Sequence, residues 1–331
     1  MISNSGIDVD EEHSIHHDNN KRIAKGVLIM KKKRFSFERL ALATGVAVIL
    51  ALAGCAAKTA APRRQEGPAA SAPPEGLILE YKMPAGRVLR YQDSTEVSEI
   101  TEVMGMTNES HSVLASSVSF QAKGRKDRDH LVGVTIDDIS LTVTGPQGDL
   151  SPDMKPVKGR SFDMVLSPLG MEVDVSGAEA IIYQFATGPR SVAPGFKVFF
   201  PDLPGKPIQI GDAWPSSFVI EDKSGATNMR VDAQSVNTLE GFETVDGMEC
   251  ARIASRNTGT ISGTGNQQGI DLLFAGTLKG TDVWYFAVKE GIYVKSTSET
   301  VNEISITVNG PQTMTIPATQ TRKSEVKLAG R

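Results

Sequence analysis

Cysteine and histidine, two residue types that act as nucleophiles, bases and metal ligands, are scarce in this chain. The 331 residues include 2 Cys and 5 His. A hydrolase triad needs a base beside a nucleophile, but His111 lies in a polar stretch, His130 follows a charged one, and no Gly-x-Ser-x-Gly elbow is present. A zinc site needs three or four ligands of these types. We therefore predict solvated turn histidines, no catalytic residue, no metal site and no cofactor.

The thiol of Cys55 has the most specific context of any reactive side chain. A basic cluster at residues 31–34 precedes an apolar run at 40–52, which is the layout of an export signal. The tetrad Leu52-Ala53-Gly54-Cys55 resembles the lipobox of bacterial lipoproteins. This resemblance implies cleavage of the signal between Gly54 and Cys55, lipidation of the Cys55 thiol and acylation of the new amino group. The alternative is an uncleaved membrane anchor, for which the apolar stretch is short.

The signal divides the chain into segments of different composition. Residues 1–29 are predicted to be untranslated leader or a cytoplasmic tail, with Met30 as the true start, and residues 30–54 are predicted to be the signal peptide. Residues 55–76 are rich in Ala and Pro, which is typical of a flexible linker behind the lipidated Cys55. Residues 77–210 are then a first β-unit with a connecting segment, and residues 211–331 a second.

The charge of the remaining chain excludes one class of partner. From Cys55 onward there are 27 basic and 33 acidic residues, a net charge of −6. A nucleic-acid-binding protein would instead carry a basic footprint. We therefore expect no nucleic acid and predict the membrane as a partner, through a lipid at Cys55.

Alternation of apolar and polar residues dominates from Leu77 onward and predicts a mainly β fold. Residues 114–122, 139–144, 270–279 and 292–300 alternate in this way, as half-buried strands do. Dipeptides such as Asp246-Gly247 between runs predict hairpins and therefore antiparallel sheets. One short helix is expected at residues 178–185, and the apolar, proline-broken residues 196–204 are expected to cap an open sheet end.

An internal match suggests that the two β-units are related. Residues 139–147 recur as residues 304–312 with seven of nine identical. We interpret this as duplication of a unit that forms a curved sheet, a half-barrel or a sandwich. The alternative is that two edge strands converged on Ser/Thr-rich alternation before Gly-Pro.

Three aromatic residues are candidates for lining a ligand site. Trp214 opens the second β-unit, and Trp284 and Phe286 lie in the most aromatic predicted strand. They could line an apolar ligand on a concave sheet or fill the core. Cys250 is predicted to be a small buried residue rather than a reactive thiol, and the glycine-rich residues 259–269 to be a hairpin loop.

Motifs along the chain resemble a family of β-rich bacterial envelope lipoproteins of unassigned function. These motifs are the lipobox, Ser-Pro-Leu-Gly at residues 167–170, Phe-Pro-Asp-Leu-Pro at residues 200–204 and Gly-Asp-Ala-Trp at residues 211–214. The resemblance brings no catalytic residues with it.

The function expected from these features is anchoring and recognition without catalysis. We expect a lipid-anchored envelope protein that binds a protein partner or an apolar ligand, or supports envelope assembly. Its location would be the outer membrane if the host is Gram-negative. One alternative is a carrier of lipids or lipoproteins with a concave β-sheet. A second alternative is an envelope hydrolase with a carboxylate pair, although no spacing singles out a pair.

Overall fold

The computed structural model describes residues 76–267, 269–310 and 312–331. Gly54 and Cys55, the predicted cleavage and lipidation positions, lie outside the described residues, as do the predicted leader, the signal and nearly all of the linker. No helix within the described ranges is long and apolar enough to cross a membrane.

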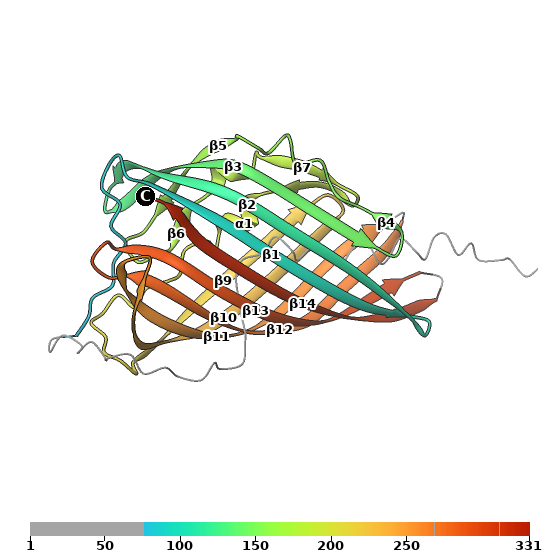
Figure 1. Ribbon diagram of the computed structural model, residues 1–331. Coiled ribbons are helices and arrows are strands. Elements are labelled where there is room, and N and C mark those ends of the chain that lie inside the picture. Colours follow the sequence, from blue (N-terminus) through green and yellow to red (C-terminus); the bar gives the residue numbers. More distant parts are fainter. Residues whose placement is uncertain (1–75, 268, 311) are drawn as a thin grey trace, which may run out of the picture.

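A single large antiparallel sheet makes up most of the described chain, which confirms the prediction of a mainly β fold. It has twelve strands in the order β6-β5-β3-β2-β1-β14-β13-β12-β11-β10-β9, with β4 attached to β3. Figure 1 shows the long strands curving together, so that the sheet has a concave inner face. Its strands are β1 (Val88–Val103), β2 (Met106–Lys126), β3 (Asp129–Gly145), β4 (Gly148–Asp149), β5 (Ser161–Leu166), β6 (Glu172–Asp174), β9 (Ala213–Ser224), β10 (Thr227–Val245), β11 (Met248–Gln267), β12 (Ile270–Ala287), β13 (Ile292–Asn309) and β14 (Thr313–Gly330).

The first and last long strands of the sheet are hydrogen-bonded neighbours. Strand β1 pairs with β14 antiparallel over a register that includes Thr95 opposite Ser324. Residues 77–210 and residues 211–331 therefore contribute to one continuous sheet rather than to two separate ones. The two copies of the internal match occupy equivalent places, since Ile139–Gly145 ends β3 and Ile304–Asn309 ends β13.

The predicted turn at Asp246-Gly247 is present and joins β10 to β11. Both residues have positive φ, 50° for Asp246 and 75° for Gly247. This is the geometry that a two-residue hairpin turn requires, so the local sequence fixes the connection.

The helix predicted at residues 178–185 is wrong. A 3₁₀ turn (Ser176–Ala178) is followed by β7 (Ile182–Phe185), which pairs with β8 (Gly188–Ser191) in a small second sheet. Tyr183 is buried and Ile182 is exposed, so the segment follows the period of a strand. In the described part of the chain the α-helix is α1 (Ala193–Phe196), a single turn that begins one residue before Pro194.

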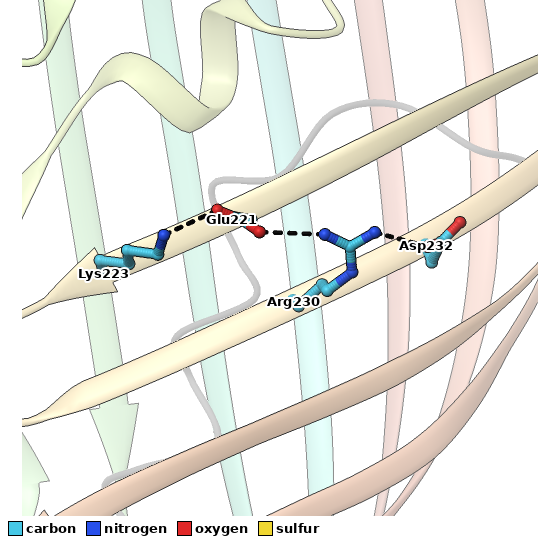
Figure 2. Close-up of polar contacts among 4 residues, drawn as sticks. All are labelled: Glu221, Lys223, Arg230 and Asp232. Carbon is cyan, nitrogen blue, oxygen red and sulfur yellow. Dashed lines mark hydrogen bonds and ion pairs between the residues drawn. The ribbon is translucent and has the colours of Figure 1, made fainter.

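The outer face of the sheet is polar and carries exposed ion pairs. On β9 and β10, Glu221 lies between Lys223 and Arg230, and Arg230 also contacts Asp232 (Figure 2). These hydrogen bonds lower the pKa of Glu221 and raise that of Arg230. Exposed pairs of this kind add little stability, so the fold depends on what lies on the inner face.

Candidate functional site

Two apolar clusters fill opposite ends of the inner face. The first cluster surrounds Tyr91, Phe120, Phe286 and Tyr293 and includes much of the segment between β5 and β9. The second cluster contains buried residues such as Ile261, Phe274 and Ile306 from β11, β12 and β13. Strands β1 and β9 to β14 contribute residues to both clusters, so each of these strands must also cross the space between the two clusters.

That space is lined by a buried band of polar side chains, which we call the polar belt. The strand register aligns its members in rows: Asp282 is opposite Ser298, Ser298 is opposite Ser324, and Ser324 is opposite Thr95. Buried members of the belt are Thr95, Glu99, Ser235, Asn237, Ser255, Asn257, Ser298, Thr300, Asn302, Gln320, Arg322 and Ser324. Burying a polar group without a hydrogen-bond partner raises the free energy of the folded state. A band of polar side chains on the inner face of a sheet, which is normally apolar, is therefore unusual.

On the β9–β12 side, the belt forms a hydrogen-bond network made of two groups of side chains. The indole Nε1 of Trp284 donates to Ser255 Oγ over 2.9 Å, and the Ser255 hydroxyl donates to Asn237 Oδ1 over 2.6 Å. Ser235 donates to Asn257 Oδ1, and Asn257 Nδ2 donates to Asp282 Oδ2 over 2.8 Å. The network holds each side chain in one orientation.

On the β13–β1 side, the belt buries two ionisable groups. Gln320 Nε2 donates to Glu99 Oε2 over 3.1 Å, and Arg322 lies within 3.3 Å of the Ser324 hydroxyl. Burial raises the pKa of Glu99 to about 7, although the bond from Gln320 opposes the rise. Among the described residues, Ser298 Oγ has no hydrogen-bond partner.

Residues 197–203, here called the strap, cross the inner face and separate two cavities. Phe200 of the strap packs on Phe120 with ring centroids 5.0 Å apart. The backbone N–H of Phe200 donates to Glu172 Oε1 over 2.7 Å, and Trp214 Nε1 donates to the carbonyl of Asp202 over 3.1 Å. These contacts fix the strap at both the β6 and the β9 side of the sheet.

The apolar cavity lies between the strap, α1 and strands β2 and β3. It has a volume of about 80 Å³ and is lined by residues that include Leu114, Ile136, Ile139 and Val326. Two charged side chains, Asp93 and Arg322, also reach it. Burial raises the pKa of Asp93 to about 6, and the nearby Arg322 guanidinium limits that rise.

The polar cavity lies on the other side of the strap, against β9 to β13. Its volume is about 210 Å³, and Val198 and Phe199 line both cavities. On the sheet side it is lined by the network of Ser255 and Asn257, and on the strap side by Glu172 and Asp202. The two cavities therefore share a thin wall but differ in chemistry.

Two carboxyl groups of the polar cavity have raised pKa values. Burial raises the pKa of Glu172 to about 8, against the lowering effect of the Phe200 N–H. Burial likewise raises the pKa of Asp202 to about 6. Neither carboxyl group forms an ion pair with a cation of the described residues, so Glu172 is mainly neutral at pH 7.

Glu172→Gln is expected to flatten the fall in stability as pH rises. The native pKa of about 8 lies above the ordinary value of 4.5, so the folded state holds this proton more tightly than the unfolded state. The stabilisation is complete below about pH 4.5 and is lost as pH rises through about 8. Melting temperatures measured across this range would show a smaller decrease for the variant. The control Glu303→Gln removes an exposed carboxyl group on β13, and an equal flattening in that control would contradict the assignment.

The aromatic residues singled out from the sequence lie close together. Trp214 and Trp284 are buried and form an edge-on pair with ring centroids 6.2 Å apart. Trp284 lines the polar cavity. Phe286 is fully buried in the first apolar cluster and packs edge-on against Tyr81. The role of these three residues in lining a ligand remains a prediction.

Three further expectations can be compared with the structure. Cys250 is a free, fully buried thiol, which confirms its prediction, and burial raises its pKa to about 11. His111 is exposed, as expected, but lies on strand β2 rather than in a turn. The prediction of a solvated turn is wrong for His130, which is buried on β3 with Nε2 3.1 Å from the carbonyl of Tyr81. Burial lowers the pKa of His130.

The loop predicted at residues 259–269 is also wrong, because most of it is β11. A Cβ at Gly259 would come within 2.6 Å of the backbone oxygen of Asp232 and 3.0 Å of Ala233. Glycine therefore allows β10 and β11 to lie close together here, rather than supplying loop flexibility.

The polar belt and Glu172 were not anticipated from the sequence. The belt residues follow the alternation of their strands, so the sequence of each strand alone predicts that their side chains point inward. What the local pattern omits is the register that collects them into a buried band.

Comparisons with known proteins identify no family. No family model matches the chain, and no curated protein matches it. Among solved structures, an outer membrane channel from Pseudomonas putida F1 is 9% identical, covering 74% of this chain and 97% of that chain, with a TM-score of 0.22. Pseudomonas aeruginosa OccK2 (OpdF) is 6% identical, covering 76% of this chain and 100% of that chain, with a TM-score of 0.21. A DUF1329 family protein from Desulfovibrio piger ATCC 29098 is 10% identical, covering 72% of this chain and 85% of that chain, with a TM-score of 0.12. These scores are too low to support an argument about function.

Proposed function

We propose that this chain is a lipid-anchored protein of the bacterial cell envelope that binds an apolar ligand and catalyses no reaction. The observation that carries the proposal is the apolar cavity of about 80 Å³ between the strap, α1, β2 and β3. Protein interiors are normally packed without such voids, and an apolar pocket with a few polar groups is typical of a ligand site.

The walls of the apolar cavity favour a ligand with one polar end. Most of the lining is aliphatic or aromatic, whereas Asp93 and Arg322 supply charge at one place. The guanidinium of Arg322 is held by the hydroxyls of Ser324 and Thr95, so it is oriented before a ligand arrives. An apolar body with a polar head would match this arrangement.

The anchor in this proposal is the Cys55 thiol of the tetrad Leu52-Ala53-Gly54-Cys55. Two or more acyl chains on one protein give stable membrane attachment. The outer membrane is the expected site in a host with two membranes, because the position after Cys55 is Ala56 rather than Asp. Binding of an envelope protein, or carriage of a lipid or lipoprotein, would be compatible with the same anchor.

One mass-spectrometry experiment tests both parts of the proposal. The full chain is expressed in a bacterium, extracted from membranes and measured under native and then denaturing conditions. We expect a lipid mass that survives denaturation, because it is covalent at Cys55, and a smaller apolar ligand that is released. Cys55→Ala should remove the covalent mass alone. Ile139→Trp, which fills the apolar cavity, should remove the released ligand alone.

The matched control is Ser140→Trp, at the next residue of β3, which is exposed on the outer face. It should keep both masses. A Cys55→Ala chain that still carries covalent lipid would refute the anchor. A ligand that persists in Ile139→Trp, or a chain that never carries one, would refute binding in the apolar cavity.

Hydrolysis is a second candidate function, favoured by one observation. Glu172 and Asp202 both line the polar cavity, and their pKa values of about 8 and about 6 differ. Two carboxyl groups with separated pKa values are the usual arrangement for acid–base hydrolysis. Turnover of a glycan or ester that is lost in Glu172→Gln would favour this function over the non-catalytic one.

A further inference from the structure

The sheet side of the polar cavity presents neutral hydrogen-bonding groups in an ordered array. Ser235, Asn237, Ser255 and Asn257 project from β10 and β11 and line the cavity, and each is at least nine-tenths buried. Ser296 of β13 joins them with 3% of its surface exposed. Five buried polar side chains facing one cavity are more than close packing of the fold requires.

The amide of Asn257 is held in place, but its hydrogen-bonding capacity is not saturated. Asn257 accepts one hydrogen bond from Ser235 and donates one to Asp282. An Asn side chain can accept two and donate two, so Asn257 retains one donor and one acceptor. The network thus fixes the orientation of the amide and leaves part of its capacity for another molecule.

The kind of group that would use this capacity follows from its mixed character. A charged amine can only donate hydrogen bonds, and a carboxylate or phosphate can only accept them, so neither would use both the free donor and the free acceptor of Asn257. A hydroxyl group does both, as do the amides and hydroxyls of the array. Anions are further disfavoured because Asp202 and Asp282 line the cavity, with Lys197 as the cationic side chain among its lining residues.

Aromatic rings supply the complementary apolar surface. Trp284, Phe199 and Phe218 line the same cavity. The indole of Trp284 is fixed because its Nε1 donates to Ser255. Rings of this type can cover the C–H face of a cyclic polyol while the array bonds its hydroxyls.

The size of the cavity limits the ligand. One water takes up about 30 Å³ in the liquid, and the cavity has about 210 Å³. It therefore has the volume of roughly seven waters on this scale, which limits the ligand to about the size of a single sugar ring.

We propose that the polar cavity binds a hydroxyl-rich ligand of monosaccharide size, with its hydroxyls on the Asn237–Asn257 array and its ring face on Trp284. The site lies across the strap from the apolar cavity and does not depend on apolar binding or on the lipid anchor.

The test is isothermal titration of the full chain in a zwitterionic, sugar-free detergent. The probes are glucose, galactose, N-acetylglucosamine and myo-inositol, with putrescine and succinate as charged comparisons. We expect saturable binding of at least one polyol and none of either charged probe. Asn257→Ala should weaken that binding at least tenfold. Thr258→Ala, on the opposite face of the same strand, should leave the affinity unchanged.

If Asn257→Ala lowers the melting temperature too far to be measured, Ser216→Ala replaces it. Ser216 lines the cavity, is only half-buried and accepts a hydrogen bond from Asn237, and its loss should weaken binding several-fold. The proposal is overturned if no polyol binds at tens of millimolar, if putrescine or succinate binds in place of the polyols, or if Thr258→Ala weakens binding as much as the cavity variants do.

Discussion

Replacing Phe200 with alanine is expected to lower the free energy of unfolding by about 3–5 kcal/mol. The side chain is 4% exposed and packs edge-on against Tyr81, Tyr91, Phe120 and Phe199, with ring centroids 5.0 to 6.2 Å away. The strap is attached to the first apolar cluster through these rings, and the surrounding strands cannot close the space left by a missing ring. Urea denaturation followed by tryptophan fluorescence measures the loss.

The control for this prediction is Leu273→Ala on the outer face of β12. Leu273 is 48% exposed, so its removal should change the free energy of unfolding by less than about 0.5 kcal/mol. A Phe200→Ala chain that loses less than about 1 kcal/mol would mean that the strap is not a structural part of the core.

Asp222→Ala is expected to cost about 3–5 kcal/mol of folding free energy. Asp222 Oδ2 is 2.7 Å from Arg190 Nη1, and the side chains are 17% and 4% exposed. Arg190 also donates to Thr187 and Thr227. Without the carboxylate, a guanidinium stays buried with its charge uncompensated, and the ion pair between β8 and the edge strand β9 is lost.

Neighbouring residues on β9 provide the control. Glu221→Ala removes a carboxylate one position away, on the exposed outer face shown in Figure 2, and should leave the unfolding midpoint nearly unchanged. The double variant Arg190→Met with Asp222→Leu should regain most of the stability, because an apolar pair replaces the ion pair without leaving a charge. Equal effects of Asp222→Ala and Glu221→Ala would refute this account.

The strands were predictable because half-buried β structure repeats every two residues. Residues 114–122 and 292–300 lie in β2 and β13 for this reason. Cys250 was predictable for a similar reason, since its strand alternates. The hairpin at Asp246-Gly247 follows from the positive φ that these two residue types tolerate.

The errors arose where tertiary contacts decide the outcome. Residues 182–185 read as a helix but pair as β7 because Tyr183 packs inward and Gly188–Ser191 supplies a partner strand. Gly259 suggested a loop, whereas it serves close packing of two strands. The charged neighbours of His130 predicted exposure to solvent, but its ring is buried and contacts the carbonyl of Tyr81, which is 49 residues away.

The cavities could not be predicted because their walls come from distant parts of the chain. Glu172, Trp284 and Asn257 line one cavity, yet no local pattern brings them together. The polar belt depends in the same way on the register of six or more strands.

The pairing of β1 with β14 also constrains how the chain can fold. Thr95 and Ser324, whose hydroxyls are 2.9 Å apart, are separated by 229 residues. Folding slows as such contacts become more distant in sequence, because the entropy of closing the loop must be overcome before the contact forms. Until β14 arrives, β1 and β13 each carry an unpaired edge that can join another chain. If strands fold in order from the N-terminus, the edge of β1 stays unpaired until β14 has formed. We therefore expect the chain to be most prone to misassembly with other chains in the interval before β14 pairs with β1.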